Sequence, residues 1–135
     1  VLAAVETVNA KMPSTLDAAA LTVMAARGQI TGGRVDGPLA FDNAINLDAA
    51  KTKGIVSPVA GEADILLVPD LEAGNMLAKQ LIYFAGATAA GIVLGARVPI
   101  VLTSRSDPLS ARIASATLAR LLVARNQIPG TGATI

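Results

Sequence analysis

The sequence contains no cysteine and no histidine, and only 2% of its residues are aromatic. Without cysteine the chain cannot form disulfides or use a thiolate nucleophile, and without histidine it cannot use a Ser-His relay. The usual zinc ligand sets are excluded for the same reason. Any catalysis must therefore rely on carboxylates, arginine, lysine, serine or backbone amides. The scarcity of aromatic residues predicts a core of alanine, valine, leucine and isoleucine.

Charge and length narrow the class of protein further. The 135 residues carry 11 basic and 10 acidic side chains, a net charge of +1, with no block of like charge. This balance argues against a nucleic-acid surface and favours a small partner. The uncharged segment 80–96 falls short of the ~18 apolar residues of a membrane span, so we expect no membrane contact. No signal peptide is visible, and Val1 in place of a starting methionine indicates a fragment.

The first half of the chain predicts one strand and two helices. A strand is expected over 1–6, followed by a helix that begins near Ser14, with Asp17 completing a capping box, and ends at Gly28. Asp48 is expected to cap a short second helix. The apolar face of the first helix, by spacing, consists of Leu16, Ala20, Val23 and Met24. Lys51 and Lys53 in the second helix are expected to be solvated side chains rather than functional ones.

The second half predicts a buried strand, a helix, a hairpin and a final helix. Residues 65–69 lack polar side chains, which is typical of a strand covered on both faces. A helix follows from Asp70, which is expected to be its cap, to Gly86. Strands over 89–94 and 100–102 are joined by a short connection and are expected to pair antiparallel. The last helix is expected to start at Asp107-Pro108 and to run to about Arg125, with 127–135 as a tail.

Two segments carry candidate functional residues. Ser104 and Arg105 precede the last helix, where free amides and the positive helix end attract an anion, and a guanidinium fits phosphate oxygens. The alternative is that this segment only caps the helix. Glu72 and Asn75 lie on one face of the helix after the buried strand, and Gly74 permits close approach. Too few carboxylates gather there for a magnesium site, so no metal is expected.

Four motifs in order resemble those of the phosphate acetyltransferase and phosphate butyryltransferase family. They are Asp36–Ile45, Ser57–Glu62, Pro69–Asn75 and the Ser104-Arg105 pair. The chain is similar to the C-terminal part of that family over nearly all of residues 1–125. The resemblance implies an α/β fold, a three-layer α/β/α architecture with a mixed sheet, like that of isocitrate and isopropylmalate dehydrogenases. This chain would be the C-terminal fragment of a two-domain protein.

The same resemblance implies a cytoplasmic, homo-oligomeric enzyme that converts acyl-CoA and inorganic phosphate into acyl phosphate and CoA. Acetyl or butyryl groups are the expected acyl groups, CoA is a substrate, and no permanently bound cofactor is implied. Phosphate would attack directly, with Ser104 and Arg105 beside the reacting thioester. The aspartate base that acetyltransferase members carry several residues after this pair is missing here, so Asp107, the only acid nearby, is the third candidate catalytic residue. The alternative is that Asp107 only caps the last helix. Substrate-binding roles are implied for Asp36, Ser57, Gly61, Glu72, Gly74 and Asn75.

The resemblance also implies a domain division. Residues 1–103 would form the second, cleft-forming domain, and 104–126 would return to a first domain whose N-terminal part is absent. The chain alone is expected to be inactive. One alternative is a noncatalytic module that senses acyl-CoA or mediates oligomerisation. Another is a metal-dependent decarboxylating dehydrogenase of related fold, but no clustered aspartates or cofactor loop are present.

Overall fold

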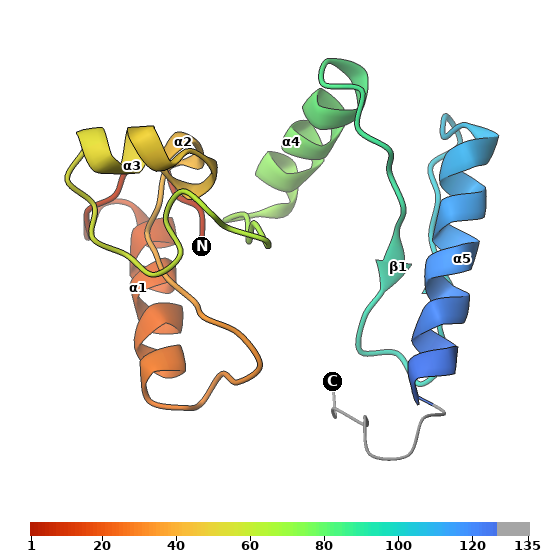
Figure 1. The fold of residues 1–135 in the computed structure, drawn as a ribbon, viewed down its shortest axis with the longest axis horizontal. Helices are drawn as coiled ribbons and strands as arrows, with labels where there is room; N and C mark the ends of the chain where they lie inside the picture. Colours follow the sequence, from red (N-terminus) through yellow and green to blue (C-terminus); the bar gives the residue numbers. More distant parts are fainter. Residues whose placement is uncertain (127–135) are drawn as a thin grey trace. The chain divides into compact units, whose positions relative to one another are not determined.

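A computed structural model describes residues 1–126; the expected tail, 127–135, lies outside the described residues. Contacts divide the chain into two compact units, Val1–Leu77 and Ala78–Ile135, which we call unit 1 and unit 2. The elements in chain order are α1 (Pro13–Ala26), α2 (Phe41–Ile45), α3 (Leu47–Thr52), α4 (Leu71–Tyr83), β1 (Ile92–Val93), β2 (Ile100–Val101) and α5 (Leu109–Asn126) (Figure 1). The domain boundary expected at residue 103 of the intact protein stays a prediction.

Small and aliphatic side chains form the core of unit 1, as the composition predicts. Leu2 and Leu39 form an isolated parallel bridge, in which the Ala3 amide donates to the Leu39 carbonyl at 2.9 Å. The buried cluster consists of Leu2, Leu39, Ala44, Ala50 and Ala60. No longer strand forms over 1–6, so the prediction of a strand there is wrong.

Helix α1 begins differently from the prediction. Met12 occupies the cap position without a side-chain hydrogen bond, and Pro13 opens the helix. The Thr15 hydroxyl, which is fully buried, accepts from the Asn9 amide and donates to carbonyls of the preceding turn. Thr15 therefore secures the helix start, and the proposed capping box of Ser14 and Asp17 is wrong.

The buried face of α1 is also not the one that hydrophobic spacing suggests. Leu16, Val23 and Met24 are exposed, whereas Thr15 and Ala18 are the buried residues of the helix. Ala18 packs close to the backbone at Gly37, where an added Cβ atom would lie 3.2 Å from the Ala18 methyl. Small side chains on this face of α1 permit the close packing, and larger ones would not fit.

Two short helices follow. Asn46 caps α3 by accepting from the amides of Asp48 and Ala49 at 2.9 and 3.0 Å, so the prediction of Asp48 as the cap is wrong. Asp48 instead lies in the first turn, where a carboxylate favours the positive helix end. Gly54 ends α3 with a left-handed φ of +67°.

The buried strand expected over 65–69 does not form. Ile65 is 84% exposed and Leu67 is 49% exposed, although Leu66 and Val68 pack against the core of unit 1. The Leu2 amide donates to the Leu67 carbonyl at 2.8 Å. A ladder needs neighbouring strands on its edges, and the described part of unit 1 places none beside this segment.

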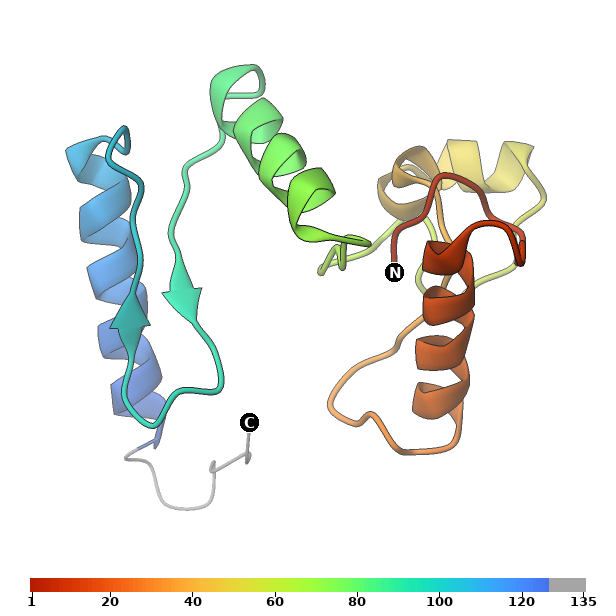
Figure 2. The ribbon, with the colours of Figure 1, turned by 180° about the vertical axis from the view of Figure 1, so that it is seen from behind.

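Unit 2 contains the predicted hairpin and the predicted final helix. Strands β1 and β2 pair antiparallel, with Ile92 opposite Val101 and Val93 opposite Ile100. Helix α5 lies along this hairpin (Figure 2). The buried Ser115 hydroxyl of α5 accepts from the Gly91 amide at 2.9 Å and donates to the Ala111 carbonyl. The hairpin and the helix are thus confirmed.

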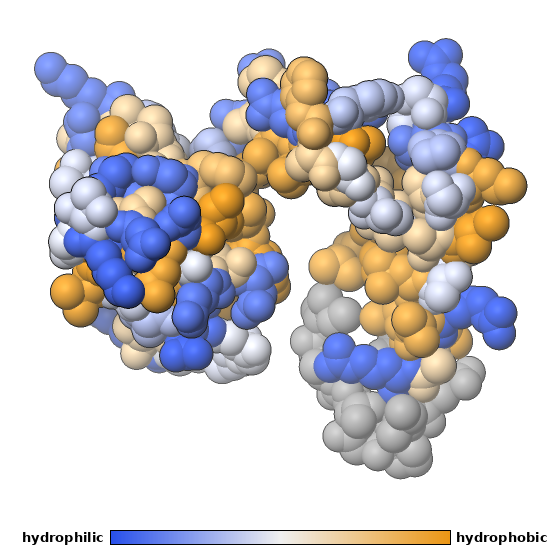
Figure 3. Space-filling view, turned by 45° about the horizontal axis from the view of Figure 1, so that its top comes forward, coloured by the Kyte–Doolittle hydropathy of each residue, from blue (hydrophilic) through white to orange (hydrophobic). Residues whose placement is uncertain are grey.

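Large apolar side chains remain exposed in both units, as Figure 3 shows in orange. No helix in the described chain is both long and apolar enough to cross a membrane. The mixture of helices and strands agrees with the predicted α/β class. The finer expectation of a three-layer architecture stays a prediction.

Candidate functional site

Ser104, Arg105 and Asp107 come together in one tight turn before α5. The Asp107 amide donates to the Ser104 carbonyl at 3.1 Å, and the Ser104 amide donates to the Asp107 carboxylate at 2.7 Å. The Ser104 hydroxyl lies 3.1 Å from that of Ser106, and either can donate. These reciprocal bonds fix the backbone on both sides of Arg105.

Arg105 lies at the exposed tip of this turn. Within the described residues its guanidinium has no hydrogen-bond or ion-pair partner, so its donors are available to a ligand. The planar group can bind two phosphate oxygens at once. The amides of Leu109 and Ser110 in the first turn of α5 also have no acceptor among the described residues. The turn therefore offers several donors to an anion.

Asp107 does not cap α5 in the expected way. Its carboxylate accepts from the Ser104 amide, which precedes the helix, and no first-turn amide of α5 donates to it in the described chain. The residue is partly buried. Asp107 thus stabilises the turn that carries Ser104 and Arg105, and the prediction that it caps the helix amides is wrong.

The start of α4 in unit 1 carries the second group of predicted residues. Asp70 caps the helix, as expected, by accepting from the Ala73 amide at 2.7 Å. Glu72 and Asn75 are exposed on this helix. A Cβ atom on Gly74 would lie 2.8 Å from a methyl of Val68, so a side chain of the same unit already occupies the space that the glycine leaves.

The segment that carries Ser57 and Gly61 forms a folded loop in unit 1. The Ser57 hydroxyl accepts from the amides of Val59 and Ala60 at 3.0 and 2.9 Å. Gly61 has a φ of +88°, and its amide donates to the Asn43 carbonyl at 2.7 Å. The structure therefore brings Ser57 and Gly61 together and attaches their loop to α2.

Asp36 lies at a turn elsewhere in unit 1. Its carboxylate accepts from the amide of the next residue, Gly37, at 2.8 Å. No hydrogen bond or ion pair joins Asp36 to the Ser57–Gly61 loop or to Glu72 among the described residues. Turn formation accounts for the carboxylate contact, and a substrate-binding role for Asp36 stays a prediction.

Unit 1 also contains a polar cluster, centred on Glu6, whose residues are not among those predicted from the sequence. The carboxylate of Glu6 accepts from Lys53 Nζ at 2.6 Å and from Asn43 Nδ2 at 2.5 Å. Lys53 also pairs with Asp42 at 3.0 Å. Lys53 is exposed, as expected, and it also forms an ion pair that its sequence neighbours do not indicate. Asp42 and Asn43 lie in the Asp36–Ile45 motif, but no neighbouring residue in the sequence indicates that Asn43 is fully buried.

The cluster shifts the protonation of its members. Hydrogen bonds from Lys53 and then Asn43 lower the pKa of Glu6 to about 2. The bond from Lys53 likewise lowers the pKa of Asp42. Contact with Glu6 and Asp42 raises the pKa of Lys53. All three groups stay charged at neutral pH, so none is suited to proton transfer there.

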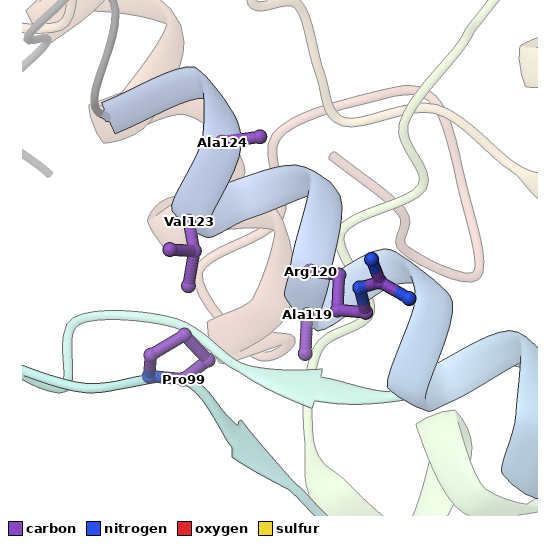
Figure 4. A pocket seen from close by; sticks show the side chains of 5 residues that line it. All are labelled: Pro99, Ala119, Arg120, Val123 and Ala124. Atoms are coloured by element: carbon purple, nitrogen blue, oxygen red, sulfur yellow. The ribbon is translucent and has the colours of Figure 1, made fainter.

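Unit 2 has a hollow of about 440 Å³ between the hairpin and α5. Ala119 and Val123 project from α5 toward the hairpin turn that carries Pro99, with Arg120 at the side (Figure 4). The nearest lining residue on α5, Ala119, lies ten positions after the first residue of the helix, or about 15 Å along its axis. The hollow is therefore not the predicted anion site. No group of three acidic residues in the described chain is arranged to hold a metal.

Comparison with known proteins shows the family. The family model described as "Phosphate acetyl/butaryl transferase" matches residues 1–119, so this chain belongs to that family. A phosphate acetyltransferase of Rhizobium meliloti is 66% identical over 94% of this chain. A phosphate butyryltransferase of Clostridium beijerinckii is 49% identical over 91% of it. The chain spans 40% and 41% of the lengths of these two relatives.

A solved structure agrees with this assignment. The chain is similar to a branched-chain phosphotransacylase from Enterococcus faecalis V583, with a TM-score of 0.77 and 39% sequence identity. The match covers 88% of this chain and 42% of that protein. The resemblance inferred from the four motifs is thus confirmed at the level of the family.

Proposed function

We propose that the intact protein transfers an acetyl or butyryl group from CoA to inorganic phosphate. The observation that carries this proposal is the family match over residues 1–119, because it includes the turn with Ser104 and Arg105. The relatives named above are a phosphate acetyltransferase and a phosphate butyryltransferase. The proposal therefore includes both acetyl and butyryl groups as possible acyl groups.

The proposed reaction needs no covalent enzyme intermediate. An oxygen of phosphate attacks the thioester carbonyl carbon, a C–O bond forms, and the C–S bond breaks. The sulfur leaves as the CoA thiolate, which then takes up a proton. This route suits a chain without cysteine or histidine, because the protein acts by positioning the reactants and stabilising charge.

We assign phosphate binding to Arg105, because its planar group is exposed and has no partner among the described residues. Ser104 would donate to the carbonyl oxygen or the sulfur as charge develops. Asp107 would hold the turn, since its carboxylate already accepts from the Ser104 amide at 2.7 Å. The substrate-binding roles expected for residues of unit 1 belong to the same proposal.

The architecture of the intact protein is part of this proposal. A two-domain, three-layer α/β/α enzyme would use residues 1–103 in its cleft-forming domain and 104–126 in the other. We propose a cytoplasmic homo-oligomer without a resident cofactor, in which CoA enters as a substrate. The exposed apolar side chains of both units support further burial in the assembled protein. The chain by itself is expected to be inactive.

The direct test supplies the purified intact protein with acetyl-CoA or butyryl-CoA and inorganic phosphate. Free thiol and acyl phosphate, trapped as a hydroxamate, should appear in equal amounts, and omission of phosphate should abolish both. Thiol release without acyl phosphate would indicate thioester hydrolysis and would contradict the proposal. Binding of acyl-CoA without any turnover would favour the noncatalytic sensing module.

A further inference from the structure

Asn43 is a buried amide that depends on a single side-chain partner. It is 0% exposed, and its Nδ2 donates to the Glu6 carboxylate, 37 positions earlier in the chain. Its Oδ1 is also buried and has no partner among the described residues. Since a carboxylate ionised at neutral pH can only accept, Glu6 determines which end of the amide faces it. Removal of this contact would leave the whole buried amide unpaired.

The backbone around Asn43 holds the loop of residues 57–62. The Asn43 carbonyl accepts from the Gly61 amide at 2.7 Å, and the adjacent Ala44 carbonyl accepts from the Ala63 amide at 3.0 Å. The loop's other hydrogen bonds among the described residues run inside it: the amides of residues 59 and 60 donate to Ser57 Oγ, and the Glu62 amide donates to the Val59 carbonyl. A shift of α2 would therefore move the loop.

We propose that Glu6 is a positioning residue for the loop of residues 57–62, acting through Asn43. This rests on the proposed function for its catalytic consequence, because Ser57 and Gly61 are expected to bind substrate. Helix α2 has only five residues, Phe41–Ile45, and few internal hydrogen bonds of its own. The contact between Glu6 and Asn43 thus holds in place a helix that is too short to be stable by its own hydrogen bonds.

Glu6 could also hold α2 through its charged neighbours instead of through Asn43. Lys53 reaches the same oxygen, Oε1, at 2.6 Å and bridges to Asp42 in α2. The side chains of Lys53 and Asp42 are 40% and 52% exposed, so solvent screens this bridge. Asn43, in contrast, is buried and depends on its contact with Glu6. Two substitutions at Glu6 distinguish the contact with Asn43 from the ion pair with Lys53.

Glu6→Asp keeps a carboxylate for Lys53 but withdraws it from Asn43 by one methylene. Glu6→Gln keeps an acceptor of the right length for Asn43 and removes the charge. We would measure deuterium uptake of peptides covering residues 57–63 in the intact protein. Exchange should be about tenfold faster in Glu6→Asp and within about threefold of wild type in Glu6→Gln, because local opening governs exchange.

Steady-state kinetics on the same variants report the catalytic consequence. The KM for acyl-CoA or phosphate should rise at least about fivefold in Glu6→Asp, with a smaller change in kcat, since the loop would affect binding first. Glu6→Gln should stay near wild type.

Three results would overturn the proposal. If both variants lower the unfolding temperature and leave loop exchange unchanged, Glu6 only stabilises unit 1. If Glu6→Gln accelerates exchange as much as Glu6→Asp, the ion pair positions the loop. If exchange rises while KM stays constant in an active enzyme, the loop does not bind substrate. A wild-type protein that forms no acyl phosphate refutes the proposed function, and the exchange comparison still decides the role of Glu6.

Discussion

A Cβ atom placed on Gly61 would lie 2.6 Å from the Cα atom of Leu47, which is closer than nonbonded atoms approach. The Gly61 amide donates to Asn43 at the same point, so the loop and the start of α3 are in direct backbone contact. Gly61 also has a φ of +88°. Packing and backbone conformation therefore each require glycine here.

Gly61→Ala is expected to destabilise unit 1 by at least about 2 kcal/mol, because strain at positive φ adds to overpacking. Gly54→Ala is the matched control, since Gly54 has a φ of +67° but no atom within 4 Å of its Cβ position. Its cost should be only about 1–2 kcal/mol. Urea unfolding of the intact variants gives both values, and equal losses would contradict the packing argument.

Ser115→Ala should loosen the contact between α5 and the hairpin. The substitution removes the acceptor of the Gly91 amide and should cost about 1 kcal/mol of unfolding free energy. Thr117→Ala is the control, because among the described residues this exposed hydroxyl bonds only within α5, to the Ile113 carbonyl. Deuterium uptake of the hairpin peptide should rise in Ser115→Ala alone; equal uptake in both variants would show that the Ser115 bond does not hold the hairpin.

The Glu6 cluster predicts a loss of stability in acid. The pKa of Glu6 is lowered from 4.5 to about 2, so its contribution is complete above pH 4.5 and is lost as the pH falls toward 2. Asp42 shifts in the same direction, while the raised pKa of Lys53 has its effect only at alkaline pH. The unfolding temperature of wild type should therefore fall more steeply between pH 4.5 and 2 than that of Glu6→Gln. Parallel curves would contradict the ionic contact.

Local chemistry explains what the sequence could predict. The hairpin of β1 and β2 and the cap at Asp70 depend on residues close in the chain, and both are confirmed. The family resemblance also depended on short motifs, and the match over residues 1–119 confirms it.

Non-local packing explains what the sequence could not predict. The segment 65–69 has the composition of a buried strand, yet Ile65 is 84% exposed, because no described strand lies beside it in unit 1. The spacing of hydrophobic residues predicted the wrong buried face of α1. The face that is buried carries the small residue Ala18, which packs against the backbone near Gly37. The burial of Asn43 depends on Glu6, 37 positions away, and no local pattern contains that distance.

The central claim is that the exposed guanidinium of Arg105 binds the reacting phosphate. The most direct test compares kcat/KM for acyl phosphate formation by the intact protein carrying Arg105→Ala, Arg105→Lys or Arg97→Ala. Arg97 is an exposed arginine of unit 2 outside the four motifs, so its removal should leave the rate near wild type. Arg105→Ala should lose at least about tenfold, and Arg105→Lys should restore little of this loss, because lysine lacks the bidentate geometry. An unchanged rate in Arg105→Ala would contradict the account.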